Sequence, residues 1–357
     1  MYSLLKGLWM NQSFRSYLNI IVTFIVVFCI FNSVSFMVFI FNPKLFYFRP
    51  WEYFFELGYQ FQEYDAFWDC EETSDLTRNN FFYYQDPHKT YVSVDKYGYR
   101  KNRIPSNKYS ILVSGGSTIF GSGLSDNETL PWMLSEKLNI PIFNGGRSSL
   151  FNTLLRDDLK DVKLIIDCST ERNIDSNLFV SQSIKKKFSP IMKNDKRILK
   201  DLDQIPVSRY LITSIIFRVF HRMYNDLIVY LTNNHKQYLY INHTFNEKDL
   251  KDAVKVIMKR KRILSKMGKN YIFVAIPAKQ TIYNNSIDRF TKNYIKNLTK
   301  LLNENGVETI NILNSLEKNK DLGLFHPYDT HWNKYGTDIA STVIAKYLLS
   351  TKKKLMY

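Results

Sequence analysis

The sequence predicts an α/β domain with three layers, in which helices cover both faces of a mostly parallel sheet, preceded by one N-terminal transmembrane helix. Two observations support this fold class. Short runs rich in β-branched residues alternate with segments of helical periodicity through most of the chain, which is typical of parallel strands joined by crossover helices. A long apolar run near the N-terminus has the length that a bilayer requires.

The apolar run is the first element of the chain. No charged residue lies between Ser16 and Pro43, and at about 1.5 Å per residue a helix over residues 17–42 can span the hydrocarbon. No small-residue cleavage site follows, which favours a retained signal anchor over a cleaved signal peptide. We therefore expect a short cytoplasmic N-terminus at residues 1–16 and an extracytoplasmic domain, periplasmic or at the cell surface. The flanking lysines and arginines give this orientation only a small bias.

Two segments follow the anchor. Residues 43–105 are aromatic-rich, membrane-proximal and without regular periodicity, and residues 106–350 form the α/β domain. Five β-rich runs predict strands, at residues 110–114, 141–144, 164–168, 271–276 and 307–312. Apolar residues at helical spacing predict helices, at residues 127–139, 247–267 and 334–349. Asn246 and Asp249 resemble a capping box at the start of the second helix.

Residues 176–245 interrupt the alternation of strands and helices. Apolar residues recur there at helical spacing, after a dense basic run at residues 185–199. The spacing predicts a helical insertion, packed on the domain or lying on the membrane surface. The basic run is typical of a solvated face.

Composition excludes several classes of protein. A hydrophobic fraction of 45% argues against disorder. The net charge of +16 favours anionic neighbours such as lipid headgroups, acidic glycans or nucleic acid, but no nucleic-acid-binding motif is found, so we expect no nucleic-acid partner. Three cysteines are too few for a disulfide scaffold, and whether Cys70 and Cys168 pair stays open. No metal-binding spacing is found, and we expect neither a metal nor an organic cofactor.

The first motif with chemical content is a glycine–serine turn after the first predicted strand of the domain. Gly115 and Gly116 permit a tight turn, and Ser117 follows at the strand-to-helix corner. Backbone amides at such a corner can point at a developing oxyanion. A phosphate-binding loop is the natural rival, but the lysine of a P-loop is absent.

The second motif is D-T-H-W, just before the last predicted helix. Asp329 and His331 lie two residues apart, so their side chains can converge on one site. A serine hydroxyl needs a base to become a nucleophile, and a histidine oriented by a carboxylate supplies one. At the carboxyl ends of parallel strands, the two motifs would meet.

Together these motifs resemble the SGNH (GDSL-like) hydrolase family, over about residues 85–350, including the preceding V-D-K-Y-G-Y-R-K-N. The resemblance implies a flavodoxin-like domain in which Ser117 is the nucleophile, His331 the base and Asp329 its orienting partner. The family's second block matches F-N-G-G, which implies an oxyanion amide at Gly146, with Asn144 opening the turn.

The third block departs from the family pattern. Where the family has G-x-N-D, this chain has S-T-E-R-N. Glu171, Arg172 and Asn173 are therefore the candidates to replace the usual asparagine donor, and an internal ion pair between Glu171 and Arg172 is an equal alternative.

D-x-H-W, E-R after the third strand and I-P-A-K-Q-T-I-Y are similar to the alginate O-acetyltransferase-like branch, in which, however, D-x-H-W precedes the nucleophile. This resemblance implies an O-acyl, above all O-acetyl, esterase or transferase that acts on a cell-envelope polysaccharide. Its partners would be an acylated glycan or glycan acceptor, membrane lipid and, for transfer, a multi-span membrane acyl donor protein. The alternative is a non-catalytic glycan-binding or assembly protein on an SGNH frame. Among the remaining side chains, we expect Trp332 in the core rather than stacked on a sugar, Lys279 exposed rather than on an anionic substrate, and His326 in a structural role.

Overall fold

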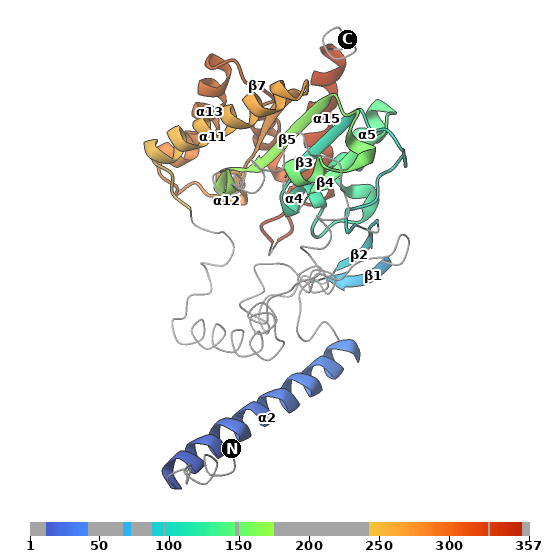
Figure 1. The fold of residues 1–357 in the computed structure, drawn as a ribbon. Helices are drawn as coiled ribbons and strands as arrows, with labels where there is room; N and C mark the ends of the chain where they lie inside the picture. The colour runs from blue at the N-terminus through green and yellow to red at the C-terminus, as the bar shows by residue number, and fades with distance from the viewer. Residues whose placement is uncertain are drawn as a thin grey trace.

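The computed structural model describes residues 12–41, 67–72, 88–95, 97–146, 150–174, 243–327 and 329–351. Its centre is a five-stranded sheet in the order β4-β3-β5-β6-β7, with all neighbouring pairs parallel (Figure 1). The strands are β3 (Ile111–Gly115), β4 (Ile142–Gly146), β5 (Leu164–Thr170), β6 (Asn270–Ile276) and β7 (Glu308–Thr309). With these strands counted along the chain the order is 2-1-3-4-5, which is the flavodoxin-like arrangement. The predicted parallel α/β sheet is confirmed.

Helices cover both faces of this sheet. On one face α5 (Leu130–Leu138) packs against α15 (Lys334–Ser350), and on the other α11 (Glu247–Lys266) packs against α13 (Arg289–Glu304) (Figure 1). Right-handed crossovers place successive helices in this way when the strand order reverses beside the first strand. The short elements of the domain are α4 (Ser117–Phe120), η3 (Asp126–Glu128), α6 (Leu150–Thr153), η4 (Asp157–Leu159), η5 (Glu171–Asn173), α12 (Lys279–Tyr283), α14 (Leu313–Lys318) and η8 (Lys320–Leu322).

Local sequence signals fix most of the long helices. At the start of α11, the Asn246 side chain accepts from the amides of Lys248 and Asp249, and Asp249 accepts in return from the Asn246 amide. The predicted capping box is therefore confirmed. The helix expected at 127–139 is wrong at its start, because η3 comes first and Thr129 is extended as the N-cap of α5, which has Pro131 in its first turn.

One further expectation fails near the far edge of the sheet, and one helix there was not expected. The strand expected at 307–312 pairs with β6 over only two residues, because the chain then turns so that Ile310 and Ile312 enter the core ahead of α14. The helix α13 was not predicted, although Asp288 caps it and one side of it is buried.

The segment before the domain contains regular structure that the sequence did not predict. β1 (Phe67–Glu72) pairs with β2 (His88–Ser93) in an antiparallel sheet of their own. The predicted insertion at 176–245 lies outside the described residues except for its last three, so it stays a prediction. Cys168 is buried with a free thiol, so the pairing with Cys70 that the sequence left open is not formed.

The N-terminal helix α2 covers Gln12–Phe41. Its described side chains from Ser16 to Phe31 are exposed, except for the partly exposed Phe28. Within the portion of the chain that the structure describes, no helix meets the combined length and apolarity of a membrane span.

Candidate active site

The site is built around the corner between β3 and α4, where Ser117 is the first helical residue. Glycines let this corner pack tightly. A Cβ on Gly115 would lie 2.5 Å from the carbonyl oxygen of Cys168, and a Cβ on Gly146 would lie 2.1 Å from the backbone nitrogen of Phe120. Only glycine therefore allows β3 to lie this close to β5 at Gly115, and α4 to rest on the end of β4 at Gly146. Because Ser117 opens the helix, no preceding turn supplies an acceptor for its amide.

A fully buried arginine holds the far end of α4. The Arg100 guanidinium pairs with Asp126 and donates to the carbonyls of Gly121 and Leu124 at 3.2 and 2.7 Å. Carbonyls that follow a helix have no partner within it, so this side chain fixes the turn behind Ser117. The sequence marked the Arg100 segment only by family resemblance, and a lone arginine carries no signal of this role.

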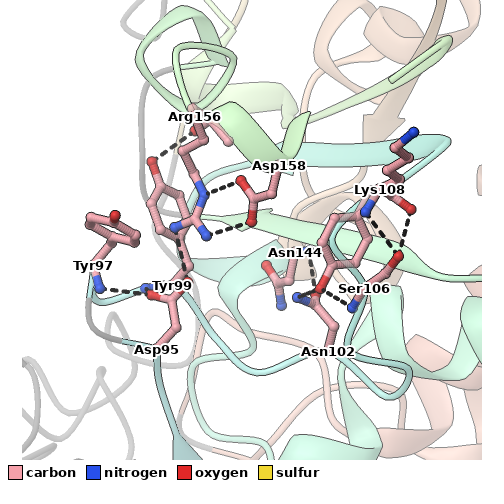
Figure 2. A network of polar contacts seen from close by, with 11 residues as sticks. Asp95, Tyr97, Tyr99, Asn102, Ser106, Lys108, Asn144, Arg156 and Asp158 are labelled. Carbon is pink, nitrogen blue, oxygen red and sulfur yellow. Dashed lines mark hydrogen bonds and ion pairs between the residues drawn. The ribbon is translucent and has the colours of Figure 1, made fainter. Parts of the chain in front are cut away.

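Beside β4, a second polar network fixes the free edge of the sheet (Figure 2). Asn102 accepts a hydrogen bond from the Asn144 amide at 2.7 Å. Further along, Arg156 binds Asp158 through two nitrogens at 2.9 and 2.8 Å and Asp95 at 2.9 Å, and its guanidinium lies over the ring of Tyr97. Edge strands need such cover because one row of their backbone groups is unpaired.

Three side chains from distant parts of the chain form one hydrogen-bonded series. Ser117 Oγ lies 2.7 Å from His331 Nε2, and His331 Nδ1 lies 2.6 Å from Asp329 Oδ1. Asp329 is completely buried, and the same oxygen also accepts the His331 backbone N–H at 2.9 Å. A carboxylate only accepts, so Nδ1 carries the proton and Nε2 is left to accept from the serine hydroxyl. This is the arrangement that activates a serine for nucleophilic attack.

The third-block residues lie in three different environments. Arg172 donates from Nη2 to the Thr330 hydroxyl at 3.1 Å, between the two members of the acid–base pair. Asn173 is exposed. Glu171 points inward, where its Oε1 accepts from the Ala278 amide at 3.0 Å and from the Thr281 hydroxyl. The structure thus brings Arg172 to the site, and it shows no ion pair between Glu171 and Arg172.

Burial perturbs Glu171. It is 1% exposed, and Oε2 has no hydrogen-bond partner among the described residues. Loss of hydration raises its pKa from 4.5 to about 7, although the bonds from Thr281 and Ala278 and the nearby charges of Arg172 and Lys292 act in the opposite direction.

Gly146 differs from the expectation. Its amide donates to Asn144 Oδ1 at 3.0 Å and is therefore already engaged, so it is not free for an oxyanion in this structure. An asparagine side chain can accept from the backbone amide two residues further on, as in an Asx turn. The observed contribution of Gly146 is instead the space that it leaves for α4.

The remaining predicted side chains are settled by burial and contact. Trp332 is 1% exposed and lies in the core, as expected. His326 joins the loop by donating its backbone N–H to the His331 carbonyl. The expectation for Lys279 is wrong, because its ammonium donates to the carbonyls of His326, at 2.9 Å, and Pro327. Unpaired loop carbonyls attract such a side chain, and a sequence does not show where they lie.

Comparison with known proteins adds to this geometry. Residues 234–356 match the family model described as an SGNH hydrolase-like domain, acetyltransferase AlgX. No curated protein matches the chain.

Solved structures give distant likenesses only. A member of the lipolytic protein G-D-S-L family from Veillonella parvula is 12% identical, with a TM-score of 0.35, and covers 68% of this chain and 98% of its own. Axe2, an acetylxylan esterase from Geobacillus stearothermophilus, is 9% identical, with a TM-score of 0.36, and covers 67% of this chain and 94% of its own. Likenesses this distant say nothing about the chemistry of the present chain. Over residues 234–356 the chain is therefore similar to an SGNH hydrolase-like domain, and its Ser117–His331–Asp329 geometry is that of a serine esterase or acyltransferase.

Proposed function

We propose that this chain is a membrane-anchored serine O-acyl esterase or transferase, with acetyl as the acyl group, that acts on an extracytoplasmic cell-envelope polysaccharide. The observation that carries the proposal is the series of hydrogen bonds from Ser117 through His331 to Asp329, at 2.7 and 2.6 Å. The description of the matching family model as an acetyltransferase supports the acyl group.

The proposed reaction has two halves. Ser117 Oγ attacks the ester carbonyl while His331 Nε2 takes the hydroxyl proton, and Asp329 stabilises the imidazolium that forms. The imidazolium then protonates the leaving alcohol, which departs and leaves an acyl-enzyme on Ser117. In the second half, water or a sugar hydroxyl gives its proton to His331 and takes the acyl group, so that Ser117 regains its proton.

The developing oxyanion needs hydrogen-bond donors. The Ser117 amide is the first proposed donor, because it begins α4 and bonds to no other described residue. Arg172 is the second, because it reaches the acid–base loop and its guanidinium has more N–H groups than the one bonded to Thr330. Gly146 contributes only if its amide leaves Asn144.

The location rests on the N-terminal segment. Residues 16–43 carry no charge, and α2 exposes large apolar side chains such as Ile20 and Phe24, at 64% and 70%. Such a surface needs an apolar environment, and a bilayer supplies it. For transfer, a separate multi-span membrane protein is the proposed acyl donor.

The full-length chain, purified in a mild detergent, tests the chemistry. The protein is mixed with an aryl acetate, the reaction is quenched early, and the mass of the intact protein is measured by mass spectrometry. We expect an acetyl adduct on the wild type and on the control Ser265→Ala, which changes an exposed serine of α11. Ser117→Ala should give none, and His331→Ala should form it roughly 10³-fold more slowly or worse. An equal adduct on Ser117→Ala would refute the proposed nucleophile.

A second experiment separates hydrolysis from transfer. The chain is given an acetylated polysaccharide together with an unmodified oligosaccharide acceptor. Acetylated acceptor that depends on Ser117 supports transfer, and acetate release without acetylated acceptor supports the esterase alone.

A further inference from the structure

The loop that carries Asp329 and His331 is far in sequence from the serine with which it acts. His331 and Ser117 are 214 residues apart in sequence. The loop precedes α15, whereas the serine follows β3. A displacement of about 1 Å between such groups can cost on the order of 10²-fold in rate. The loop therefore needs its own attachment to the sheet.

Lys279 supplies one such attachment, in addition to the bond from Arg172 to Thr330. Its ammonium donates to two successive carbonyls of the loop, those of His326, at 2.9 Å, and Pro327. The His326 carbonyl also accepts the amide of Asp329, at 3.2 Å. The positive charge of Lys279 therefore lies beside the turn that ends at Asp329. An ammonium with three donors and no acceptor suits a site made only of carbonyl oxygens.

The base of this lysine is itself fixed. Lys279 is the first residue of α12, which follows β6 almost directly. Glu171, at the end of β5, accepts from the Ala278 amide on one side of Lys279 and from the Thr281 hydroxyl on the other. The ammonium thus connects the loop to the ends of two neighbouring strands of the sheet that also carries Ser117.

We infer that Lys279 is a positioning residue for the acid–base pair, which holds the loop of Asp329 and His331 at the distance that Ser117 requires. The inference rests on the proposed function of Ser117 as the nucleophile. It differs from a role in substrate binding, because the ammonium is engaged with the loop. Loss of the lysine should therefore lower the limiting rate of acylation and leave the dissociation constant of the substrate unchanged.

The test uses the full-length chain and aryl acetate. In Lys279→Met the limiting acylation rate in single-turnover kinetics should fall on the order of 10²-fold, with the substrate dissociation constant within about twofold of wild type. Lys279→Arg, which keeps a cationic donor, should recover at least about a tenth of the wild-type rate. The matched control is Lys292→Met, because Lys292 donates to the Thr281 carbonyl of the same helix at 2.6 Å. This control should keep the wild-type rate.

Each outcome decides a separate point. A folded Lys279→Met variant that acylates at the wild-type rate overturns the positioning role, and so does a rise in the substrate dissociation constant with an unchanged limiting acylation rate. If the methionine variant does not fold, Lys279→Gln is judged by the same criteria. A wild-type chain without a Ser117-dependent adduct overturns the proposed function together with the inference, whereas a normal wild-type adduct confines any failure to Lys279.

Discussion

Replacing Glu171 by glutamine should change how the stability of the domain depends on pH. The carboxylate is buried at the junction of β5 and α12, and burial raises its pKa from 4.5 to about 7. Between these two values the folded chain binds more protons than the unfolded chain, so the free energy of unfolding falls as the pH rises. Glutamine keeps an oxygen for Ala278 and Thr281 and does not titrate.

The magnitude follows from the shift. One pKa unit corresponds to about 1.4 kcal/mol, so a rise from 4.5 to about 7 implies that the wild type loses about 2–3 kcal/mol between about pH 5 and about pH 8 through this group. The variant should not show this loss. As the pH rises, the free energy of unfolding of Glu171→Gln should therefore increase by that amount relative to the free energy of unfolding of the wild type.

Urea unfolding of the full-length chain, followed by far-UV circular dichroism at several pH values, measures this difference. Glu136→Gln, at an exposed position of α5, is the control for the loss of one negative charge. A stability difference between Glu171→Gln and wild type that does not change between about pH 5 and about pH 8 would refute the reasoning. So would a difference that moves towards the wild type as the pH rises.

Three other changes have expected outcomes. Arg260→Met removes one partner of the buried Arg260–Asp167 ion pair, whose charged atoms lie 2.7 Å apart. Urea unfolding should show a loss of about 3–5 kcal/mol, because the Asp167 carboxylate is left buried without its cation. A loss below about 1 kcal/mol would contradict this. Gly146→Ala places a Cβ 2.1 Å from the Phe120 backbone nitrogen, so α4 must shift. The rate of acylation by aryl acetate should fall at least about tenfold, because Ser117 moves with α4. An unchanged rate would mean that α4 does not move. Asn333→Ala removes the side chain that caps α15 at 3.0 Å and should cost about 1 kcal/mol in the same urea assay, with no cost if water replaces the cap.

The sequence by itself determined the order of elements and the chemistry of the two motifs. Apolar runs set the strands, and the pattern of strands and helices allows few arrangements other than a parallel sheet. A parallel sheet brings the carboxyl ends of its strands to one edge, so Ser117 and the D-T-H-W motif were expected to lie close together. The structure places Ser117 Oγ 2.7 Å from His331 Nε2. The capping box of α11 could also be predicted from the sequence, because the two residues that form it lie within one stretch of four residues.

Only the tertiary structure decided what each polar side chain near the site does. Glu171 and Arg172 are adjacent in sequence, yet one is buried against α12 and the other reaches Thr330. Lys279 binds a loop 47 residues away, and the Gly146 amide is taken by Asn144. Each of these outcomes depends on which carbonyl or carboxylate lies within about 3 Å. That distance is set by the packing of strands and helices far apart in the chain, and local patterns do not contain it.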